Sequence, residues 1–308
     1  MDLKQLRALL AVSEHRSFSA AARALHTVQS NVSTHVSRLE REMGVALIDR
    51  TTNLLTEEGL VVAERARRME AEFTALESDV ASLRDEIRGK VRVGVIGTTA
   101  RWFVPRLLGA IGEQHPAIKV VILDATTSSL VPQLIAGQID LAVLNLPIND
   151  ADLVVEDLFD EDRVLVAPAG HPLYDRRSVT FAELAEHDLL LEATGTSFRD
   201  ELDTQAAEFG VELKAQAEVD GMRLLASLAF SGYGAAILPA SAAPGWVGGD
   251  WRRIPIEGAG IRSVGLARRR RGLPSAAERA VADLTKWVVV DGAPEGSGIH
   301  PTCEPPPV

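Results

Sequence analysis

The chain contains a single cysteine, Cys303, which excludes an intramolecular disulfide and a thiolate metal site. It contains no uninterrupted apolar run of about eighteen residues, so no membrane-spanning helix or membrane partner is expected. Charged residues stand near the first methionine, where a secretory leader needs an apolar core, and we therefore expect a cytoplasmic protein. The seven histidines lack ligand spacing, so neither a metal nor a cofactor is expected.

Catalytic motifs are absent from the sequence as well. Residues 195–199, GTSFR, fail the nucleophile-elbow pattern at the last position, where that pattern has glycine. The chain also lacks a GxxxxGK phosphate loop, an HExxH helix and a CxxC pair. We therefore assign no catalytic residue and expect a protein that is not an enzyme.

Basic side chains are outnumbered, with 32 lysines and arginines against 43 acidic residues and a net charge of −11. That balance disfavours nucleic acid as a partner, because lysine and arginine supply the contacts to phosphate. The charge is unevenly distributed, since residues 1–56 carry seven basic and five acidic side chains. The asymmetry indicates an N-terminal module with a partner of its own.

Three short helices are predicted in this N-terminal module. Leucines recur at helical spacing in residues 3–12, and small side chains follow in residues 20–25. A third helix repeats apolar residues every three or four positions, at Val28, Val32, Val36, Leu39 and Met43. Its opposite face is short and polar, with Ser30, Asn31, Ser33, Thr34, Ser37, Arg38 and Arg41. The pattern fits a helix-turn-helix whose second helix enters the major groove of DNA, although a plain helical bundle fits equally well.

A longer helix is predicted over residues 57–88, which contain no proline and no glycine after Gly59. Apolar residues step alternately by four and three positions, at Val62, Ala66, Met69, Phe73, Leu76, Val80, Leu83 and Ile87. This spacing is typical of a helix that pairs with a partner helix, so we expect a dimer. A core helix inside one domain is the alternative. A two-fold dimer beside a helix-turn-helix suits a palindromic DNA site.

From Gly89 onward, strand-like and helical segments alternate. This order predicts two α/β lobes, each built on a parallel sheet with helices on its faces. Residues 89–160 and 265–290 are expected to form lobe I and residues 161–264 lobe II, so the chain crosses twice between them. Residues 291–308 are expected to be a disordered tail.

Polar side chains follow several predicted strands, at the sheet edge where open α/β folds bind ligands. Helix N-termini at these positions favour anions, so a small metabolite with an anionic group is the expected ligand. The candidates are Thr98, Thr99, Arg101, Thr127, Ser128, Asn145 and Thr196. Each also has an ordinary interpretation, as a helix cap or a surface arginine. The four arginines of residues 268–271 can either contact phosphate or end a strand in solvent.

Taken in order, these features resemble the LysR-type transcriptional regulators over about residues 1–290. The N-terminal match consists of SFSAAARAL (17–25), QSNVS (29–33), RLE (38–40), GVALIDR (44–50) and LTEEG (55–59). Looser matches follow at GQIDLAV (137–143), AP (167–168), HPL (171–173) and GYG (232–234) leading to LP (238–239).

The resemblance implies an all-α winged helix-turn-helix domain over residues 1–58 and a long coiled-coil linker helix over residues 59–88. An α/β effector domain of two Rossmann-like lobes, similar to periplasmic binding proteins, would follow over residues 89–290. In the DNA-binding domain, Gln29, Ser30, Ser33 and Thr34 would face the major groove, with Arg50 and Asn53 on the wing. Effector contacts would fall on Thr98, Thr99, Thr127, Asn145, Thr196 and Gly221.

Family membership also implies partners. These are double-stranded DNA at an interrupted palindromic promoter site, a small-molecule effector, further copies of the chain in a dimer or tetramer, and RNA polymerase if the protein activates transcription. Residues 51–54 form a wing shorter than is usual in the family, without its basic residues, and Gly221 stands where a hydroxyl side chain is frequent. Two other functions stay open at this point: a cytoplasmic solute-binding protein, or an α/β enzyme with an appended helical domain.

Overall fold

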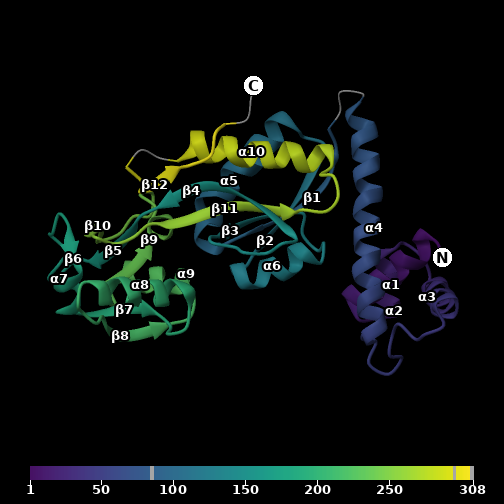
Figure 1. Ribbon diagram of the computed structural model, residues 1–308, viewed down its shortest axis with the longest axis horizontal. Helices are drawn as coiled ribbons and strands as arrows, with labels where there is room; N and C mark the ends of the chain where they lie inside the picture. Colours follow the sequence, from purple (N-terminus) through teal and green to yellow (C-terminus); the bar gives the residue numbers. More distant parts are fainter. Residues whose placement is uncertain (84–86, 294–295, 306–308) are drawn as a thin grey trace.

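The computed structural model describes residues 1–83, 87–293 and 296–305 of the chain. It has three parts, shown in Figure 1: an N-terminal helical domain, a long helix α4 and an α/β domain of two lobes. Helix α4 lies between the other two parts and contacts both of them. In the part of the chain that is described, no helix is both long and apolar enough to cross a membrane.

The N-terminal domain consists of α1 (Leu3–His15), α2 (Phe18–Ala24) and α3 (Gln29–Met43). A capping box between Asp2 and Gln5 starts α1, and Ser17 caps α2 by accepting a hydrogen bond from the amide of Ala20. Helix α3 ends at Gly44, whose φ of 74° closes the last turn in the left-handed conformation. The apolar sides of the three helices meet in a core that includes Leu9, Val36 and Leu39.

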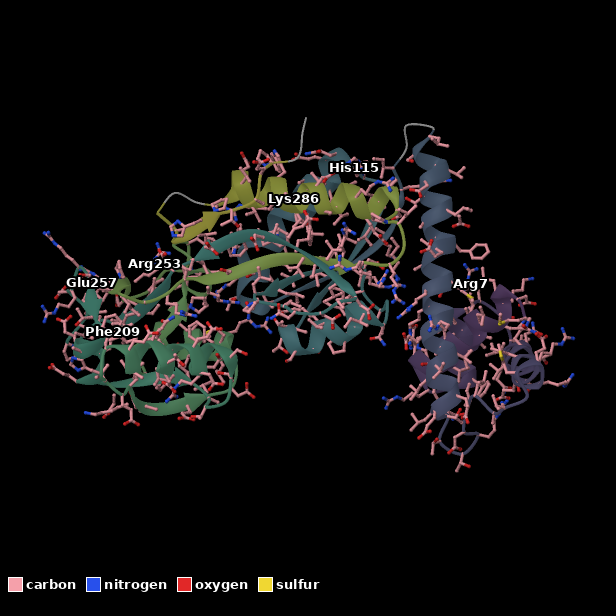
Figure 2. All side chains as sticks on the ribbon, in the orientation of Figure 1. Arg7, His115, Phe209, Arg253, Glu257 and Lys286 are labelled. Atoms are coloured by element: carbon pink, nitrogen blue, oxygen red, sulfur yellow. The ribbon has the colours of Figure 1, made fainter. Side chains whose placement is uncertain are left out.

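Helix α4 runs from Glu57 to Ser82 and packs its first half on the N-terminal domain. Arg7 of α1, labelled in Figure 2, pairs with Glu70 of α4 at 3.0 Å between Nε and Oε1. At the other end of α4, Ser78 and Asp79 accept hydrogen bonds from the first amides of α10 (Ala276–Gly292). The helix therefore holds the N-terminal domain against lobe I.

The predicted extent of this helix, to residue 88, is wrong at its C-terminal end. Helix α4 stops at Ser82, and residues 84–86 lie outside the described residues. Ile87 lies beyond the helix and packs against the core of lobe I, where burial of its side chain is favourable. The last position of the predicted repeat thus belongs to another hydrophobic core.

Lobe I contains a six-stranded sheet in the order β12-β4-β11-β3-β1-β2. Its strands are β1 (Gly89–Val95), β2 (Ile118–Asp124), β3 (Leu141–Asn145), β4 (Leu153–Glu161), β11 (Arg262–Arg269) and β12 (Ile299–Pro301). Its helices are α5 (Gly97–Gln114), α6 (Thr127–Ile135) and α10. Figure 1 shows α10 along one face of the sheet and α6 on the other. Trp102, Phe103 and Phe159 are among the largest side chains buried in this lobe.

Lobe II contains a second six-stranded sheet in the order β6-β10-β5-β9-β7-β8. Its strands are β5 (Arg163–Pro168), β6 (Val179–Thr180), β7 (Asp188–Glu192), β8 (Lys214–Val219), β9 (Ala236–Pro239) and β10 (Trp251–Glu257). Its helices are α7 (Phe181–Ala185), α8 (Ser197–Glu208), α9 (Met222–Phe230) and the 3-10 helix η1 (Ala240–Ala242). Apolar clusters lie on both faces of this sheet.

The two lobes and the two crossings agree with the prediction, but the sheets are not purely parallel. Strand β11 pairs antiparallel with β3 and β4, and β5 pairs antiparallel with β9 and β10. The returning strand β11 enters the middle of lobe I against the direction of β3, which explains the mixed sheet.

The tail was also predicted incorrectly. Residues 299–301 form β12 on the edge of the lobe I sheet, where they pair antiparallel with β4. Within the expected tail, residues 294–295 and 306–308 lie outside the described residues. Without β12, the backbone donors and acceptors on this edge of β4 would lack partners in the sheet. The tail supplies those partners.

Candidate DNA-binding and effector sites

The polar face of α3 is exposed. Gln29, Ser30, Asn31, Thr34 and Arg38 are open to solvent, and Ser33 is half-buried. Two of these side chains bond within the helix region: Thr34 Oγ1 donates to Ser30 O at 2.8 Å, and Asn31 Nδ2 donates to Thr27 Oγ1 at 3.0 Å. The side chains of Gln29 and Arg38 make no hydrogen bond or ion pair with the residues that the structure describes, so they can meet another molecule.

A short wing follows α3. Its two sides meet at one antiparallel bridge between Ile48 and Leu55. The Asp49 carboxylate accepts hydrogen bonds from the amides of Thr51 and Thr52 at the tip, and these bonds lower its pKa. Asn53 adopts a φ of 57°, a conformation that asparagine tolerates better than most residues. The tip is therefore shaped by local hydrogen bonds.

Arg50 and Ser37 attach the wing to α3. Arg50 Nη2 lies 2.5 Å from Glu40 Oε2 and donates to Ser37 Oγ at 3.3 Å. The guanidinium also lies 5.0 Å from the centre of the Phe18 ring. Glu40 was not predicted as a site residue. Its Oε1 accepts hydrogen bonds from the amides of Leu47 and Ile48. Nothing in the sequence distinguishes Glu40 from a solvated helical glutamate, because its partners come from the fold of the wing.

Helix α4 exposes an apolar stripe along its second half. Met69, Phe73, Leu76, Val80 and Leu83 are 44, 52, 62, 53 and 85% exposed. Two residues of the predicted dimer seam lie elsewhere, because Ala66 is buried in the N-terminal domain and Val62 packs against the same core. The predicted repeat is thus divided between two surfaces. Val62 and Ala66 pack inside the chain, whereas Met69 and the positions after it up to Leu83 are open to solvent.

A cleft of about 500 Å³ lies between the lobes. Four of the predicted effector residues line it: Thr98, Thr127, Asn145 and Gly221. They lie at strand ends and helix starts, as expected for an open α/β sheet. Thr127 Oγ1 accepts the Asn145 amide at 3.1 Å, which joins the end of β3 to the start of α6.

The other four predicted effector residues are not among those that line this cleft. Thr99 is fully buried, whereas Arg101 is exposed to solvent on α5. Ser128 shares a hydrogen bond with Thr126, and Thr196 caps α8 by accepting the amide of Arg199. The sequence pattern placed these residues near strand ends, but helix rotation decided which side chains face the cleft.

Arg262, which was not predicted, is the buried cation of the cleft. Its Nε donates to Asn145 Oδ1 at 2.8 Å and its Nη1 to Thr98 Oγ1 at 3.2 Å. Nη1 also lies 3.1 Å from Oε1 of Glu161, which is completely buried. A lone arginine at the start of β11 gives no sequence signal, because its three partners come from distant parts of the chain.

Carboxylates predominate on the cleft wall. Asp124 of lobe I forms an ion pair with Arg223 of lobe II, which joins the two sides. Glu192 and Asp220 line the cleft without an ion pair to any residue in the described ranges. Burial raises the pKa of the Glu192 carboxyl, and the neighbouring Asp220 acts in the same direction. Both guanidiniums of the cleft are thus neutralised within the chain, whereas two carboxyls are not.

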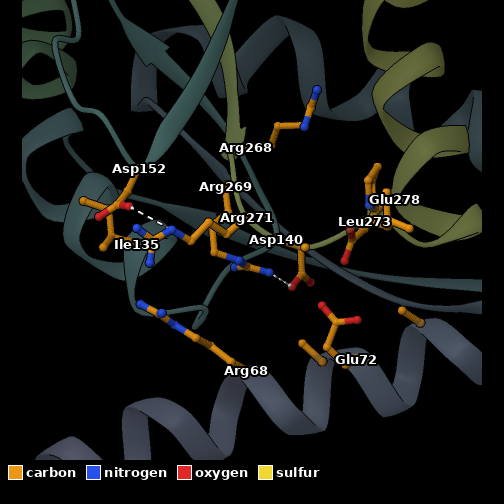
Figure 3. A pocket seen from close by; sticks show the side chains of 14 residues that line it. Arg68, Glu72, Ile135, Asp140, Asp152, Arg268, Arg269, Arg271, Leu273 and Glu278 are labelled. Carbon is orange, nitrogen blue, oxygen red and sulfur yellow. Dashed lines mark ion pairs between the residues drawn. The ribbon is translucent and has the colours of Figure 1, made fainter.

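A smaller cavity of about 170 Å³ lies between α4 and lobe I, at the arginine run (Figure 3). Arg269 pairs with Asp140 at 3.9 Å, Arg271 pairs with Asp152 at 3.8 Å, and Arg270 donates to two main-chain carbonyls. These arginines hold the ends of lobe I strands together, which favours the structural interpretation of the run over phosphate binding. The described residues contain no cluster of histidine, cysteine and acidic side chains that could hold a metal ion.

A winged helix-turn-helix joined by a helix to a two-lobed domain with an interlobe cleft is the architecture of a ligand-responsive DNA-binding regulator. Residues 3–60 match the bacterial regulatory helix-turn-helix proteins of the lysR family, and residues 84–287 match the LysR substrate binding domain. The chain belongs to the LysR family of transcriptional regulators. The predicted family, fold class and regulatory rather than enzymatic function are confirmed.

Relatives and solved structures agree with this assignment. The chain is 36% identical over 244 residues to a probable hydrogen peroxide-inducible genes activator of Streptomyces viridosporus, covering 78% of each protein. Full-length OxyR from Pseudomonas aeruginosa, in a form with one cysteine replaced by aspartate, superimposes with a TM-score of 0.77 at 24% identity, covering 99% of each chain. CbnR complexed with its target DNA gives a TM-score of 0.68 at 24% identity, covering 95% of this chain and 100% of CbnR.

Proposed function

We propose that the protein activates transcription from a promoter with an interrupted palindromic site, which it binds as a dimer or tetramer. The exposed polar face of α3 carries this proposal, because it presents hydrogen-bonding side chains of the length that base edges require. The activator role comes from the relative in Streptomyces viridosporus, and it implies contact with RNA polymerase. Since the target is promoter DNA, the protein acts in the cytoplasm.

Within the DNA-binding domain, we assign base reading to residues on the polar face of α3: Gln29, Ser30, Asn31, Ser33, Thr34 and Arg38. Arg50 and Ser37 have a positioning role, because their polar atoms are engaged with Glu40 and with each other. Asn53 sets the turn of the wing through its left-handed backbone, and the wing approaches the DNA backbone. The division separates residues that select a sequence from residues that hold the reading helix in place.

Oligomers are held together by the apolar stripe of α4. An exposed row that includes Phe73 and Leu76 is costly to leave in water, and pairing with the same row of a second copy removes it from solvent. Two copies would carry two reading helices, which a palindromic site requires.

The effector differs from that of the peroxide-responsive relative. Cys303 is the chain's only cysteine, so peroxide cannot be recorded as a disulfide within one chain. Burial also raises the pKa of the Cys303 thiol, which lowers the share of reactive thiolate. We propose that the signal is instead a small metabolite bound reversibly in the interlobe cleft.

The charges of the cleft favour an effector with a cationic or hydrogen-bond-donating group such as an amine. Glu192 and Asp220 can pair with such a group, whereas Arg262 and Arg223 already face carboxylates of the chain. The anionic effector expected from the sequence fits this wall less well, because it would meet more negative than unpaired positive charge.

Fluorescence anisotropy tests DNA recognition most directly. The full chain is titrated onto the DNA upstream of its own gene and onto a shuffled fragment, at several salt concentrations. Specific binding should favour the native fragment by about 100-fold or more. Gln29→Ala should lower that preference about 5- to 150-fold, since a base contact is worth about 1–3 kcal/mol.

Gln114→Ala is the matched control, because Gln114 is also an exposed helical glutamine but ends α5 in lobe I. It should leave the preference unchanged. Equal binding of both fragments by the native chain, with and without an amine effector, would refute the proposed recognition. Equal losses in the two variants would refute the role of Gln29.

A further inference from the structure

A groove of about 710 Å³ lies between the N-terminal domain and lobe I, beside α4. We call it the interdomain groove. Helices α1 and α4 form one wall, and strands β1 and β2 of lobe I form the other. Figure 1 shows β1 next to α4, and the groove adjoins the cavity of Figure 3. It shares no lining residue with the interlobe cleft, so a molecule bound here is separate from the effector of that cleft.

Three basic side chains gather on the lobe I wall. Lys90 and Arg92 are two positions apart on β1, so they lie on one face of the sheet with their Cα atoms about 6.6 Å apart. Lys119 of β2 is the register partner of Lys90, which places it on the same face about 4.8 Å across the strands. Helix α6 covers this face further along β1, where Leu130 lies over Gly94. The two lysines are therefore exposed, and Arg92 is half-buried.

Helix α4 adds a fourth cation from the opposite wall. Arg67 lines the groove, and its Nη2 donates to Ser13 Oγ at 3.5 Å. None of the four cations forms an ion pair with a residue in the described ranges. Other arginines of lobe I differ in this respect, since Arg269, Arg271 and Arg279 all pair with carboxylates. The charges of the groove are thus available to an anion from outside the chain.

Carboxylates also line the groove, but most of their charge is already compensated. Asp140 and Glu70 each pair with an arginine. Burial raises the pKa of Glu278 to about 7, so this carboxyl carries only part of a negative charge near neutral pH. Glu14 is the remaining carboxylate among the lining residues described. The groove therefore holds more unpaired positive charge than negative charge.

The size and the remaining surface of the groove suit a small molecule. Its volume falls within the roughly 300–1,000 Å³ of small-molecule sites. Val121 and Leu123 of β2 are half-buried and give apolar surface beside the cations. Gln138 is exposed, and its side-chain amide can donate to an oxygen of the ligand. Lysine and arginine bind phosphoryl groups well, because charge-assisted hydrogen bonds to phosphate oxygens are strong.

We propose that the interdomain groove binds a small molecule that carries a diphosphate group. The spacing of Lys90, Arg92 and Lys119 lets two neighbouring phosphoryl groups be contacted at once, and Arg67 reaches the diphosphate from α4. A bound diphosphate adds contacts between α4 and lobe I, so it strengthens the joint between the DNA-reading domain and the effector lobes. Neither DNA nor a ligand of the interlobe cleft is needed for this binding.

Isothermal titration calorimetry of the full chain with inorganic pyrophosphate tests the site. Sodium chloride keeps the ionic strength equal in every titration, because salt screens exposed charges. Pyrophosphate should bind saturably at one site per chain, and orthophosphate, with a single phosphoryl group, should bind at least about 5-fold more weakly. A repeat titration in the presence of a short DNA duplex should give the same pyrophosphate affinity, because the reading face of α3 lies outside the groove.

Two strand lysines provide matched variants. Lys90 on β1 and Lys214 on β8 of lobe II are both exposed, and neither forms an ion pair within the ranges described. Lys90→Gln should weaken pyrophosphate binding about 5- to 20-fold without changing the Tm of the unliganded protein, whereas Lys214→Gln should leave the affinity unchanged. Arg92→Gln should weaken binding at least as much as Lys90→Gln. Absence of pyrophosphate binding, equal affinities in the two lysine variants, or displacement of pyrophosphate by the duplex would overturn the proposal.

Discussion

Replacing Glu278 with glutamine should stabilise the protein at neutral and alkaline pH. Glu278 lies in the first turn of α10, where its carboxylate accepts the amide of Ser275 in a capping box. It also lines the cavity between α4 and lobe I, together with Asp140, Glu72 and Arg269 (Figure 3). Burial, followed by the like charges of Asp140 and Glu72, raises the pKa of Glu278 to about 7.

The size and sign of the effect follow from this pKa. Because the folded-state pKa lies above the ordinary value of 4.5, the native state binds the proton more tightly than the unfolded state does. The stability that the protonated Glu278 carboxyl contributes is fully present below about pH 4.5 and is lost as the pH rises through about 7. Each tenfold change in proton affinity is worth about 1.4 kcal/mol, and screening by solvent reduces the total, so the loss amounts to about 2–3 kcal/mol.

Glutamine keeps the cap, since its side-chain oxygen also accepts the Ser275 amide, and it removes the buried charge. Urea denaturation of native and Glu278→Gln proteins between pH 5 and pH 8.5 measures the difference. The variant should gain about 2–3 kcal/mol at pH 8.5 and about a quarter of that at pH 5. A gain that does not depend on pH, or a loss at pH 8.5, would refute the reasoning.

Glu183→Gln is the matched control, because Glu183 occupies the same capping-box position in α7. Hydrogen bonds from the backbone and side chain of Thr180 lower the pKa of Glu183, and they outweigh the smaller opposing effect of burial. Its contribution to stability is therefore present at neutral pH and disappears as the pH falls below the ordinary value. Glutamine at this position should not stabilise the protein at pH 8.5.

Two other predictions concern oligomers and effector. Replacing both Phe73 and Leu76 with glutamate places charges in the α4 stripe and should raise the dimer dissociation constant at least about 100-fold, measured by sedimentation, whereas unchanged dimers would contradict the assigned interface. Primary amines should raise the Tm of the native protein and lose that effect in Glu192→Gln, whereas matched carboxylates should not raise it. Hydrogen peroxide should leave promoter affinity unchanged, and a peroxide response abolished by Cys303→Ser would exclude the proposed class of effector.

The local structure was largely predictable from residue patterns. Leucine spacing, the small residues of α2 and the apolar repeat of α3 located the N-terminal helices, because these features act within one or two helical turns. The two α/β lobes followed from the alternation of strands and helices. Strands β4 and β10 were missed, because acidic, arginine and proline residues interrupt their apolar pattern, and burial of one face is decided by neighbouring strands.

Site residues were predictable where one element presents them and not where distant segments meet. The polar face of α3 follows from helical periodicity alone, and Thr98, Thr127 and Asn145 follow from their positions at strand ends. Arg262 was not predictable, because its partners lie up to 164 positions away in the sequence. The same holds for Arg50, whose pairing with Glu40 depends on the fold of the wing.

The sequence by itself determined the family, the order of domains, the amphipathic helices and the lack of a cysteine pair, since these depend on composition and short-range spacing. Tertiary structure alone decided which apolar positions of α4 stay exposed, which polar residues face the cleft, and which arginines are neutralised. The reason is physical: burial and pairing depend on all the segments that converge at a point, and no local pattern encodes that convergence.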